Sequence, residues 1–139
     1  MSKTDSIAPA EGYGADPYFV ATPEARPFWD AAAEGRLLLK HCRGCSRAHW
    51  YPRSICPLCG SDDTEWIEAS GQGTVYACTP IERANPPYVV AYVKLAEGPL
   101  VLTNLVDFPA ADLRIDAPVS VRFVASAEGR SVPVFTPAA

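Results

Sequence analysis

The sequence has no apolar run close to the roughly 18 residues that a membrane-spanning helix needs. Its first six residues, Met1 to Ser6, also lack the charged and then apolar pattern of a secretory signal. We therefore expect a cytoplasmic protein, in a compartment where disulfides rarely persist. Charged residues make up 20% of the chain and apolar residues 48%, a balance that argues against global disorder and supplies enough side chains for a core.

The residue patterns on which many enzymes depend are also missing. The sequence shows no catalytic triad, no paired acidic residues for acid–base chemistry and no phosphate-binding loop. We therefore expect the chain not to be an enzyme on its own. A sequence pI of 5.1 and a net charge of −4 argue against nucleic-acid binding, because phosphate contacts need a basic surface.

One absence is local, since no Asp or Glu occurs between Gly35 and Ser61. This span holds five basic residues and leaves seven basic against sixteen acidic residues in the rest of the chain. Three interpretations stay open: neutralisation of a thiolate metal site, contact with an anionic ligand or acidic partner, and a solvated basic loop. The five basic residues of this span are Arg36, Lys40, Arg43, Arg47 and Arg53.

Four of the five cysteines form two Cys-x-x-Cys pairs that are separated by ten residues: Cys42, Cys45, Cys56 and Cys59. Each pair presents two thiolates from one turn, and the two turns together predict a tetrahedral four-sulfur site. Zn²⁺ is favoured because it is redox-inert, although iron accepts the same geometry. We expect one structural Zn²⁺ per chain and no metal-assisted hydrolysis, because a closed site has no position for water. A dithiol redox pair or plain buried thiols is the alternative.

Other reactive and aromatic side chains near the cysteines receive simpler interpretations. Cys78 lies outside the pattern and is read as a small side chain of a β domain. His41 and His49 flank the two turns and are read as surface residues or as hydrogen-bond donors to sulfur. Trp50 and Tyr51 lie between the turns, where they either pack beneath the metal site or dock on a partner.

Three regions surround or precede this site. Residues 1–21 are rich in Ala, Gly, Ser and Pro and predict a flexible arm. Residues 22–36 predict a helical segment in two short pieces, because Pro27 interrupts it. Residues 37–69 predict the metal-binding ribbon, with strands over 36–41 and 65–68 and with Trp66 filling the junction to the next domain.

Residues 70–139 predict a β domain that begins at the glycine-rich hinge 70–73. Tyr88 and Tyr92 are interpreted as core residues, and Pro133 restricts the last strand to an edge or an open corner. Five short strands with the longest link between the third and fourth predict a partly open OB-type barrel. The expected strands cover 74–83, 88–95, 100–106, 118–124 and 132–135.

The joined pattern resembles one family over roughly residues 20–136. It is carried by Phe28-Trp29 before Gly35-Arg36-Leu37, the two cysteine turns joined through Tyr51-Pro52-Arg53, Ser70 to Tyr76, Pro87 to Ala91, and Leu105-Val106-Asp107. These features are similar to the acyl-CoA-associated zinc-ribbon plus OB-fold proteins known as domain of unknown function 35. The resemblance implies a mainly β fold with N-terminal helices, a rubredoxin-like zinc ribbon and then a five-stranded OB-fold barrel.

The resemblance also implies a role. Such proteins are non-catalytic partners of thiolase-superfamily enzymes, either acyl-CoA thiolases or aldolases, and of related hydratases. A CoA thioester is then expected at or near the interface. Candidate contacts to CoA or to the partner are Arg43, Arg47, Arg53, Trp50 and Tyr51. The alternative is a stand-alone module that binds acyl-CoA or single-stranded nucleic acid.

The sequence departs from the family pattern at two positions. Ser46 stands where a Gly commonly follows the first cysteine turn, and Asp116 stands where a Gly is common before the fourth barrel strand. The first substitution is expected to alter hydrogen bonding to sulfur, and the second makes the turn into that strand less predictable.

Overall fold

Proline positions set the start of the helical segment in the computed structural model, which describes residues 22–138. The 3₁₀ turn η1 (Pro23–Ala25) leads directly into α3 (Arg26–Ala33). Pro27 lies in the first turn of α3, where a backbone N–H has no intrahelical acceptor and its absence costs nothing. Two short pieces are therefore present as predicted, but Pro27 lies inside the second piece rather than breaking the segment. The predicted arm over residues 1–21 lies outside the described residues.

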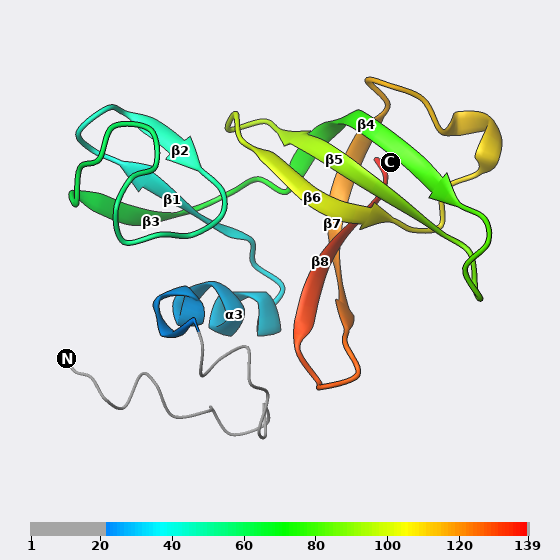
Figure 1. Cartoon of the computed structure of the whole chain (residues 1–139), viewed down its shortest axis with the longest axis horizontal. Coiled ribbons are helices and arrows are strands. Elements are labelled where there is room, and N and C mark those ends of the chain that lie inside the picture. The colour runs from blue at the N-terminus through cyan, green and yellow to red at the C-terminus, as the bar shows by residue number, and fades with distance from the viewer. Residues whose placement is uncertain (1–21, 139) are drawn as a thin grey trace.

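The first sheet is a three-stranded antiparallel ribbon with the order β2-β1-β3 (Figure 1). Its strands are β1 (Leu38–Cys42), β2 (Arg47–His49) and β3 (Thr64–Glu68). The sequence predicted strands at β1 and β3, and these two strands pair antiparallel. It missed β2, because a strand of three residues is too short to show an alternating pattern.

The second sheet is a closed barrel with the order β4-β5-β6-β8-β7. Its elements are β4 (Gln72–Ile81), β5 (Tyr88–Leu95), β6 (Leu100–Leu105), the 3₁₀ turn η2 (Ala110–Asp112), β7 (Pro118–Ala125) and β8 (Ser131–Pro137). The five predicted strands are confirmed, and the partly open barrel is wrong. The parallel pairing of Leu105 with Phe135 joins β6 to β8, and Thr103 donates a hydrogen bond of 3.0 Å to the carbonyl of Pro133. A proline is tolerated here because the ladder between β6 and β8 is short.

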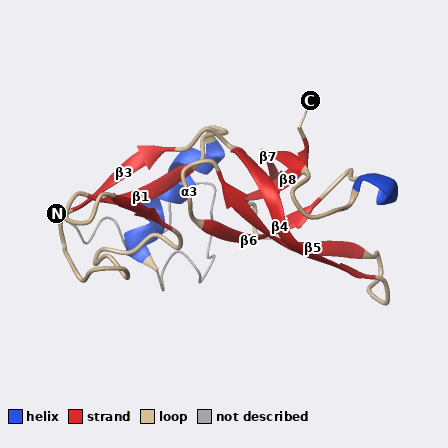
Figure 2. Cartoon of the chain, turned by 90° about the horizontal axis from the view of Figure 1, so that it is seen from above, coloured by secondary structure: helices blue, strands red, loops and turns tan. Residues whose placement is uncertain are grey.

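The helix α3 joins the two sheets, since it packs on both β1 and β8 (Figures 1 and 2). Phe28 is fully buried at this junction, with its ring centroid 4.8 Å from Trp29 and 4.9 Å from Trp50. The prediction that Trp66 fills the junction is therefore wrong. Trp66 is half-buried in β3, with the Lys40 ammonium 4.7 Å from its ring centroid. Among residues 22–138, no helix is long and apolar enough to cross a membrane.

Both positions at which the sequence departs from the family pattern have left-handed backbone. Ser46 has φ of 59° and Asp116 has φ of 69°, and glycine adopts this conformation without steric cost. The turns nevertheless close in the expected way. The Ser46 N–H donates to the Cys42 carbonyl at 2.8 Å, and the Asp116 N–H donates to the Val75 carbonyl at 2.8 Å. The turn before β7 therefore forms, with aspartate in the place of glycine.

The hinge glycine Gly71 gives a test of how closely the hinge packs on the barrel. Its φ is +81°, and a Cβ there would lie 2.6 Å from Cγ1 of Val121. Gly35 has nearly the same φ, +80°, and a Cβ added to it would meet nothing within 4 Å, so it serves as the matched control. We expect Gly35→Ala to cost about 1 kcal/mol through φ alone and Gly71→Ala to cost about 1–3 kcal/mol more through the clash. Guanidinium unfolding of zinc-loaded protein measures both, and equal losses would contradict close packing at Gly71.

Candidate metal centre and the adjoining groove

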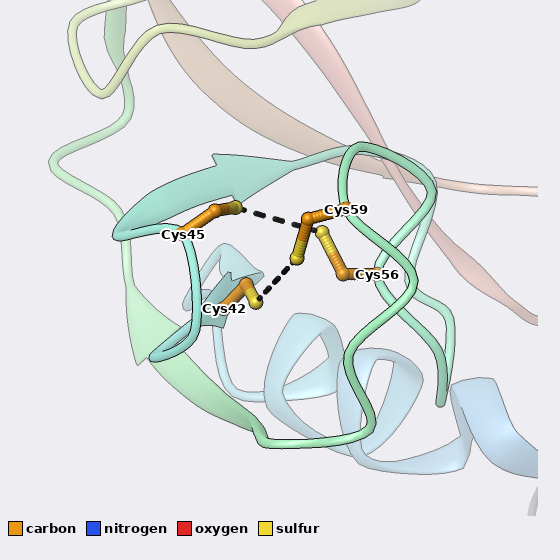
Figure 3. A group of neighbouring side chains, drawn as sticks. All are labelled: Cys42, Cys45, Cys56 and Cys59. Carbon is orange, nitrogen blue, oxygen red and sulfur yellow. Dashed lines mark hydrogen bonds between the residues drawn. The ribbon is translucent and has the colours of Figure 1, made fainter.

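The four predicted cysteines converge on one point of the ribbon (Figure 3). Cys42 ends β1 and Cys45 lies in the turn that follows, while Cys56 and Cys59 come from the loop between β2 and β3. All four sulfur atoms lie within 4.8 Å of one another. The Sγ atoms of Cys42 and Cys59 are 3.6 Å apart, and those of Cys45 and Cys56 are 3.8 Å apart.

This geometry fits a tetrahedral zinc ion. Zn–S bonds of about 2.3 Å place sulfur atoms about 3.8 Å apart around one ion. The backbone N–H of Leu58 already points at the Cys56 sulfur at 3.3 Å, which is the kind of hydrogen bond that orients a thiolate ligand. Four sulfur ligands fill the coordination of zinc, so the site is structural and offers no position for a reacting water.

The pKa values of the thiols differ within the cluster, because each thiol has different hydrogen-bond donors and sulfur neighbours. Backbone N–H groups, that of Cys45 first, lower the pKa of Cys42. Burial acts to raise the pKa of Cys45, but hydrogen bonds from Arg47 and the neighbouring thiols outweigh it and lower the pKa to about 7. The Ser61 backbone acts to lower the pKa of Cys59, yet the neighbouring sulfurs raise it to about 11. Close sulfurs cannot all ionise without a cation, so metal binding releases protons from this cluster.

Charge around the centre is largely neutralised within the ribbon. The interaction of Arg47 with the Cys45 thiol is the main reason that the pKa of Arg47 is raised. Arg43 forms ion pairs of 2.8 Å with Asp63 and of 2.8 Å with Glu65. The missing acidic residues of the basic span are thus supplied by β3 and the segment before it. Neutralisation of the metal site is the interpretation that Arg47 supports.

A groove of about 760 Å³ lies beside the metal centre, between the ribbon and the connection from β5 to β6. Ribbon residues form one wall, and Glu97 to Leu100 form the other. Glu97 ties the β5–β6 connection to the hinge that follows the ribbon, because it accepts a hydrogen bond of 2.8 Å from the Ser70 N–H. No sequence motif indicates this groove, because its two walls come from distant parts of the chain. The principal lining residues are Arg47, His49, Trp50, Leu58, Ile67 and Leu100.

The five residues predicted to contact CoA or the partner lie in different parts of the ribbon. Arg47 and Trp50 line the groove, whereas Arg43 lies on the acidic side of the ribbon with its two carboxylates. Tyr51 packs with its ring centroid 5.5 Å from Trp50. Arg53 is exposed and forms no ion pair with a carboxylate in residues 22–138. The rings of Trp50 and Tyr51 thus pack together beneath the ribbon, and Trp50 also lines the groove.

His49 was predicted to be a surface residue or a hydrogen-bond donor to sulfur, and this prediction is wrong because the side chain is buried without such a bond. It is 3% exposed, and neither ring nitrogen has a hydrogen-bond partner of good geometry in the described chain. Burial lowers the pKa of His49, the charges of Lys40 and Arg53 lower it further, and the backbone of Arg53 acts in the opposite direction without reversing the shift. The imidazole is therefore neutral in the folded protein near neutral pH.

Loss of one metal ligand is expected to unfold the ribbon. Cys56→Ser should reduce zinc from one ion per chain to nearly none, because a three-thiolate site loses most of the binding energy of roughly 10–16 kcal/mol that structural zinc supplies. Cys78→Ser is the matched control, since Cys78 lies in the barrel strand β4 and outside the cluster. Metal analysis and amide hydrogen exchange measure the result. Full zinc content with unchanged protection of β1 and β3 in Cys56→Ser would contradict a structural role.

His49 should make the ribbon sensitive to mild acid. Its folded pKa lies below the ordinary value of 6.5, so the unfolded chain takes up a proton that the folded chain rejects as the pH falls through 6.5. The free energy of unfolding should therefore decrease from about pH 7.5 to about pH 6 in the native protein, and less so in His49→Phe. Gly35→Ala is the control and should keep the native slope, because it changes no titratable group and retains His49. Denaturant titrations at full zinc saturation measure the slopes, and an unchanged slope in His49→Phe would refute the assignment.

Comparison with known proteins gives the same two parts that the structure contains. Residues 29–65 match the family model described as ChsH2, rubredoxin-like zinc ribbon domain, and residues 66–124 match ChsH2, C-terminal OB-fold domain. A solved structure described as the Ltp2-ChsH2(DUF35) aldolase matches with a TM-score of 0.71 and 34% identity, covering 84% of this chain and 95% of that chain. A DUF35 protein of Sulfolobus solfataricus matches with a TM-score of 0.62 at 14% identity, covering 84% of this chain and 86% of that one, which shows the fold alone.

Relatives in sequence carry two kinds of name. A protein of Thermomonospora curvata named probable enoyl-CoA hydratase alpha subunit is 37% identical over 80% of this chain, but the match covers 37% of that protein. A DUF35 domain-containing scaffold protein of Pyrococcus furiosus is 38% identical over 50% of this chain and 57% of its own length. A second, from Methanocaldococcus jannaschii, is 32% identical over 63% of this chain and 67% of its own length. The chain therefore belongs to the DUF35 family in its ChsH2-type form, with a rubredoxin-like zinc ribbon followed by an OB-fold domain.

Proposed function

We propose that this chain is a non-catalytic accessory subunit that binds and supports a thiolase-superfamily enzyme, an acyl-CoA thiolase or aldolase, that acts on CoA thioesters. The observation that carries the proposal is the closed four-sulfur centre within a DUF35 chain. Its ligands are all protein thiolates, so the metal stabilises a platform and takes no part in a reaction. The chemistry then belongs to a partner.

The names of relatives support a scaffold role. Two archaeal relatives are named scaffold proteins, and the solved relative is named for an aldolase that joins Ltp2 with ChsH2(DUF35). The hydratase relative is likewise named as a subunit, a probable enoyl-CoA hydratase alpha subunit. A scaffold needs a rigid shape, which the zinc centre and the buried Phe28 junction provide.

The groove is our proposed location for a CoA thioester at the interface. It has apolar walls in Trp50, Ile67 and Leu100, suited to an acyl chain or pantetheine arm, and it has Arg47 at its ribbon side. Arg53 is exposed and has no carboxylate partner in residues 22–138, so it is available for a phosphate. Arg43 is the weakest of the predicted CoA contacts, because its guanidinium is already held by Asp63 and Glu65.

A stand-alone acyl-CoA module is the second candidate, and the groove is the observation that favours it. Its volume of about 760 Å³ falls within the range of roughly 300–1,000 Å³ that is typical of ligand sites. Single-stranded nucleic acid is the less favoured form of this alternative, because the chain carries a net charge of −4.

Co-expression distinguishes the two candidates. Each thiolase-superfamily protein of the source organism is co-expressed with the full chain, followed by size-exclusion chromatography and an assay of the partner. We expect one complex to elute intact at micromolar concentration, with partner turnover that depends on this chain. Cys56→Ser should abolish the complex because the ribbon unfolds, and Cys78→Ser should retain it.

Separate elution from every candidate enzyme, together with unchanged partner activity, would overturn the proposal. Calorimetry on the isolated chain then decides the alternative. Binding of a free acyl-CoA would support the stand-alone module, while salt-sensitive binding of a single-stranded oligonucleotide would point to nucleic acid.

A further inference from the structure

The outward face of β4, β5 and β6 is unusual for the outside of a barrel, because it carries one charged side chain, Lys94. Side chains on β5 alternate strictly, with the odd-numbered positions from Ala91 to Leu95 buried. The even-numbered positions of β5 and β6, and the β4 residues that pair with them, form the outward face. Charged and polar residues usually occupy such positions in water.

The outward face contains a continuous apolar row. Tyr92 lies directly opposite Leu102 on one side and Ala77 on the other, and a bulge between Val75 and Ala77 places Tyr76 next to it. The hydrogen bond from Asp116 to Val75 brings the following connection alongside β4 at the same level. The row crosses three neighbouring strands in the order Tyr76, Tyr92 and Leu102, which are 57%, 45% and 57% exposed, and Ile115, 54% exposed, belongs to the connection beside β4.

The exposed apolar area is comparable to the largest patch on a typical monomer, and patches of that size are often functional. A tyrosine side chain buries about 150–250 Å² when fully covered, so the half-exposed Tyr76, Tyr88 and Tyr92 offer roughly 300 Å². That value already reaches the usual size of the largest apolar patch on a monomer, about 300–600 Å². Leu102 and Ile115 enlarge the patch toward the area of roughly 800 Å² that each partner contributes to a stable interface.

The chemistry of the outward face identifies its occupant as a protein. The large apolar side chains of this face are spread over neighbouring strands, an arrangement suited to an extended contact with another protein. A nucleic-acid strand also stacks on aromatic rings, but it needs a basic track, and this face provides Lys94 alone. Tyrosine and leucine without charge match the composition of the buried centre of a protein interface.

The outward face also continues into the groove. Leu100 belongs to the outward side of β6, opposite Lys94, and it lines the groove beside the ribbon. The helix α3 packs on β1 and β8, so it leaves this side of the barrel open (Figure 1). A protein seated on the row would therefore cover the groove at its Leu100 end.

We propose that the outward face of β4, β5 and β6, centred on Tyr92 and Leu102, is the surface on which the thiolase-superfamily partner docks. This inference rests on the proposed function and assigns its interface. The partner buries the uncharged row and closes the adjoining groove, so that a CoA thioester there is shielded from water by both proteins.

The test uses zinc-loaded full-length chain and the partner that co-elutes with it. Tyr92→Glu and Leu102→Glu place a carboxylate in the middle of the row without entering the core, because both side chains point outward. Ile55→Glu is the matched control, since Ile55 is 51% exposed on the ribbon. Dissociation constants come from biolayer interferometry, and zinc content and circular dichroism check that every variant is folded.

We expect Tyr92→Glu and Leu102→Glu each to weaken the complex at least tenfold, Tyr92→Phe to stay within about twofold, and Ile55→Glu to bind like the native chain. Native-like binding by both row variants would overturn the interface and leave the proposed function standing. Loss of binding in Ile55→Glu alone would place the partner on the ribbon instead. Failure of the native chain to bind any thiolase-superfamily protein would overturn the proposed function and this interface together.

Two further measurements exclude other occupants of the outward face. Sedimentation of the isolated chain should show a monomer, and a dimer that Leu102→Glu dissociates would assign the face to a second copy. Fluorescence anisotropy with a labelled oligothymidylate should show no binding that depends on Tyr92. Binding lost in Tyr92→Ala would assign the face to nucleic acid and overturn a protein partner.

Discussion

Mutual repulsion of four thiolates within 4.8 Å is the constraint on which the ribbon depends. The Cys42 to Cys59 segment has few buried apolar side chains of its own, apart from Cys42, Cys56 and Pro52. Its turns therefore stay together only when a cation balances the sulfurs. The shifted thiol pKa values express the same constraint, since the pKa of Cys45 is lowered to about 7 while that of Cys59 is raised to about 11. Arg47 helps from outside the cluster, but one guanidinium cannot neutralise four sulfurs.

The metal centre also determines how the rest of the chain is arranged. It fixes β1, and β1 presents Leu39 to the helix α3, whose Phe28 continues the same core into the barrel. Glu97 adds a polar tie from the barrel to the hinge. The groove exists because these two connections hold the ribbon at a distance from the β5–β6 connection without closing it. A scaffold can present a defined surface only when its parts are fixed in this way.

The sequence predicted those features that depend on local spacing. Two Cys-x-x-Cys turns, the short helical segment within residues 22–36 and five alternating strands can each be recognised within a few residues, and all are present. Features that depend on contacts across the chain were missed. Closure of the barrel rests on a pairing of Leu105 with Phe135, thirty residues away, and the junction was assigned to Trp66 although Phe28 fills it. The groove likewise combines segments that carry no common motif.

The prediction that Tyr88 and Tyr92 are core residues is wrong, because both lie on the outward face of β5. Tyr88 and Tyr92 were read as core residues because aromatic side chains in strands are usually buried. In β5, however, both sets of alternating positions are apolar except for Lys94, so alternation around Tyr88 and Tyr92 does not decide which set points inward. The barrel interior admits Ala91, Val93 and Leu95, which are buried, and the larger tyrosines lie outside. Around Tyr92, β5 is therefore apolar on both faces, and among the described residues its outward side chains Tyr88 and Tyr92 stay about half exposed. Exposed apolar side chains that gather in this way often mark an interaction site, which is why this face is our candidate interface.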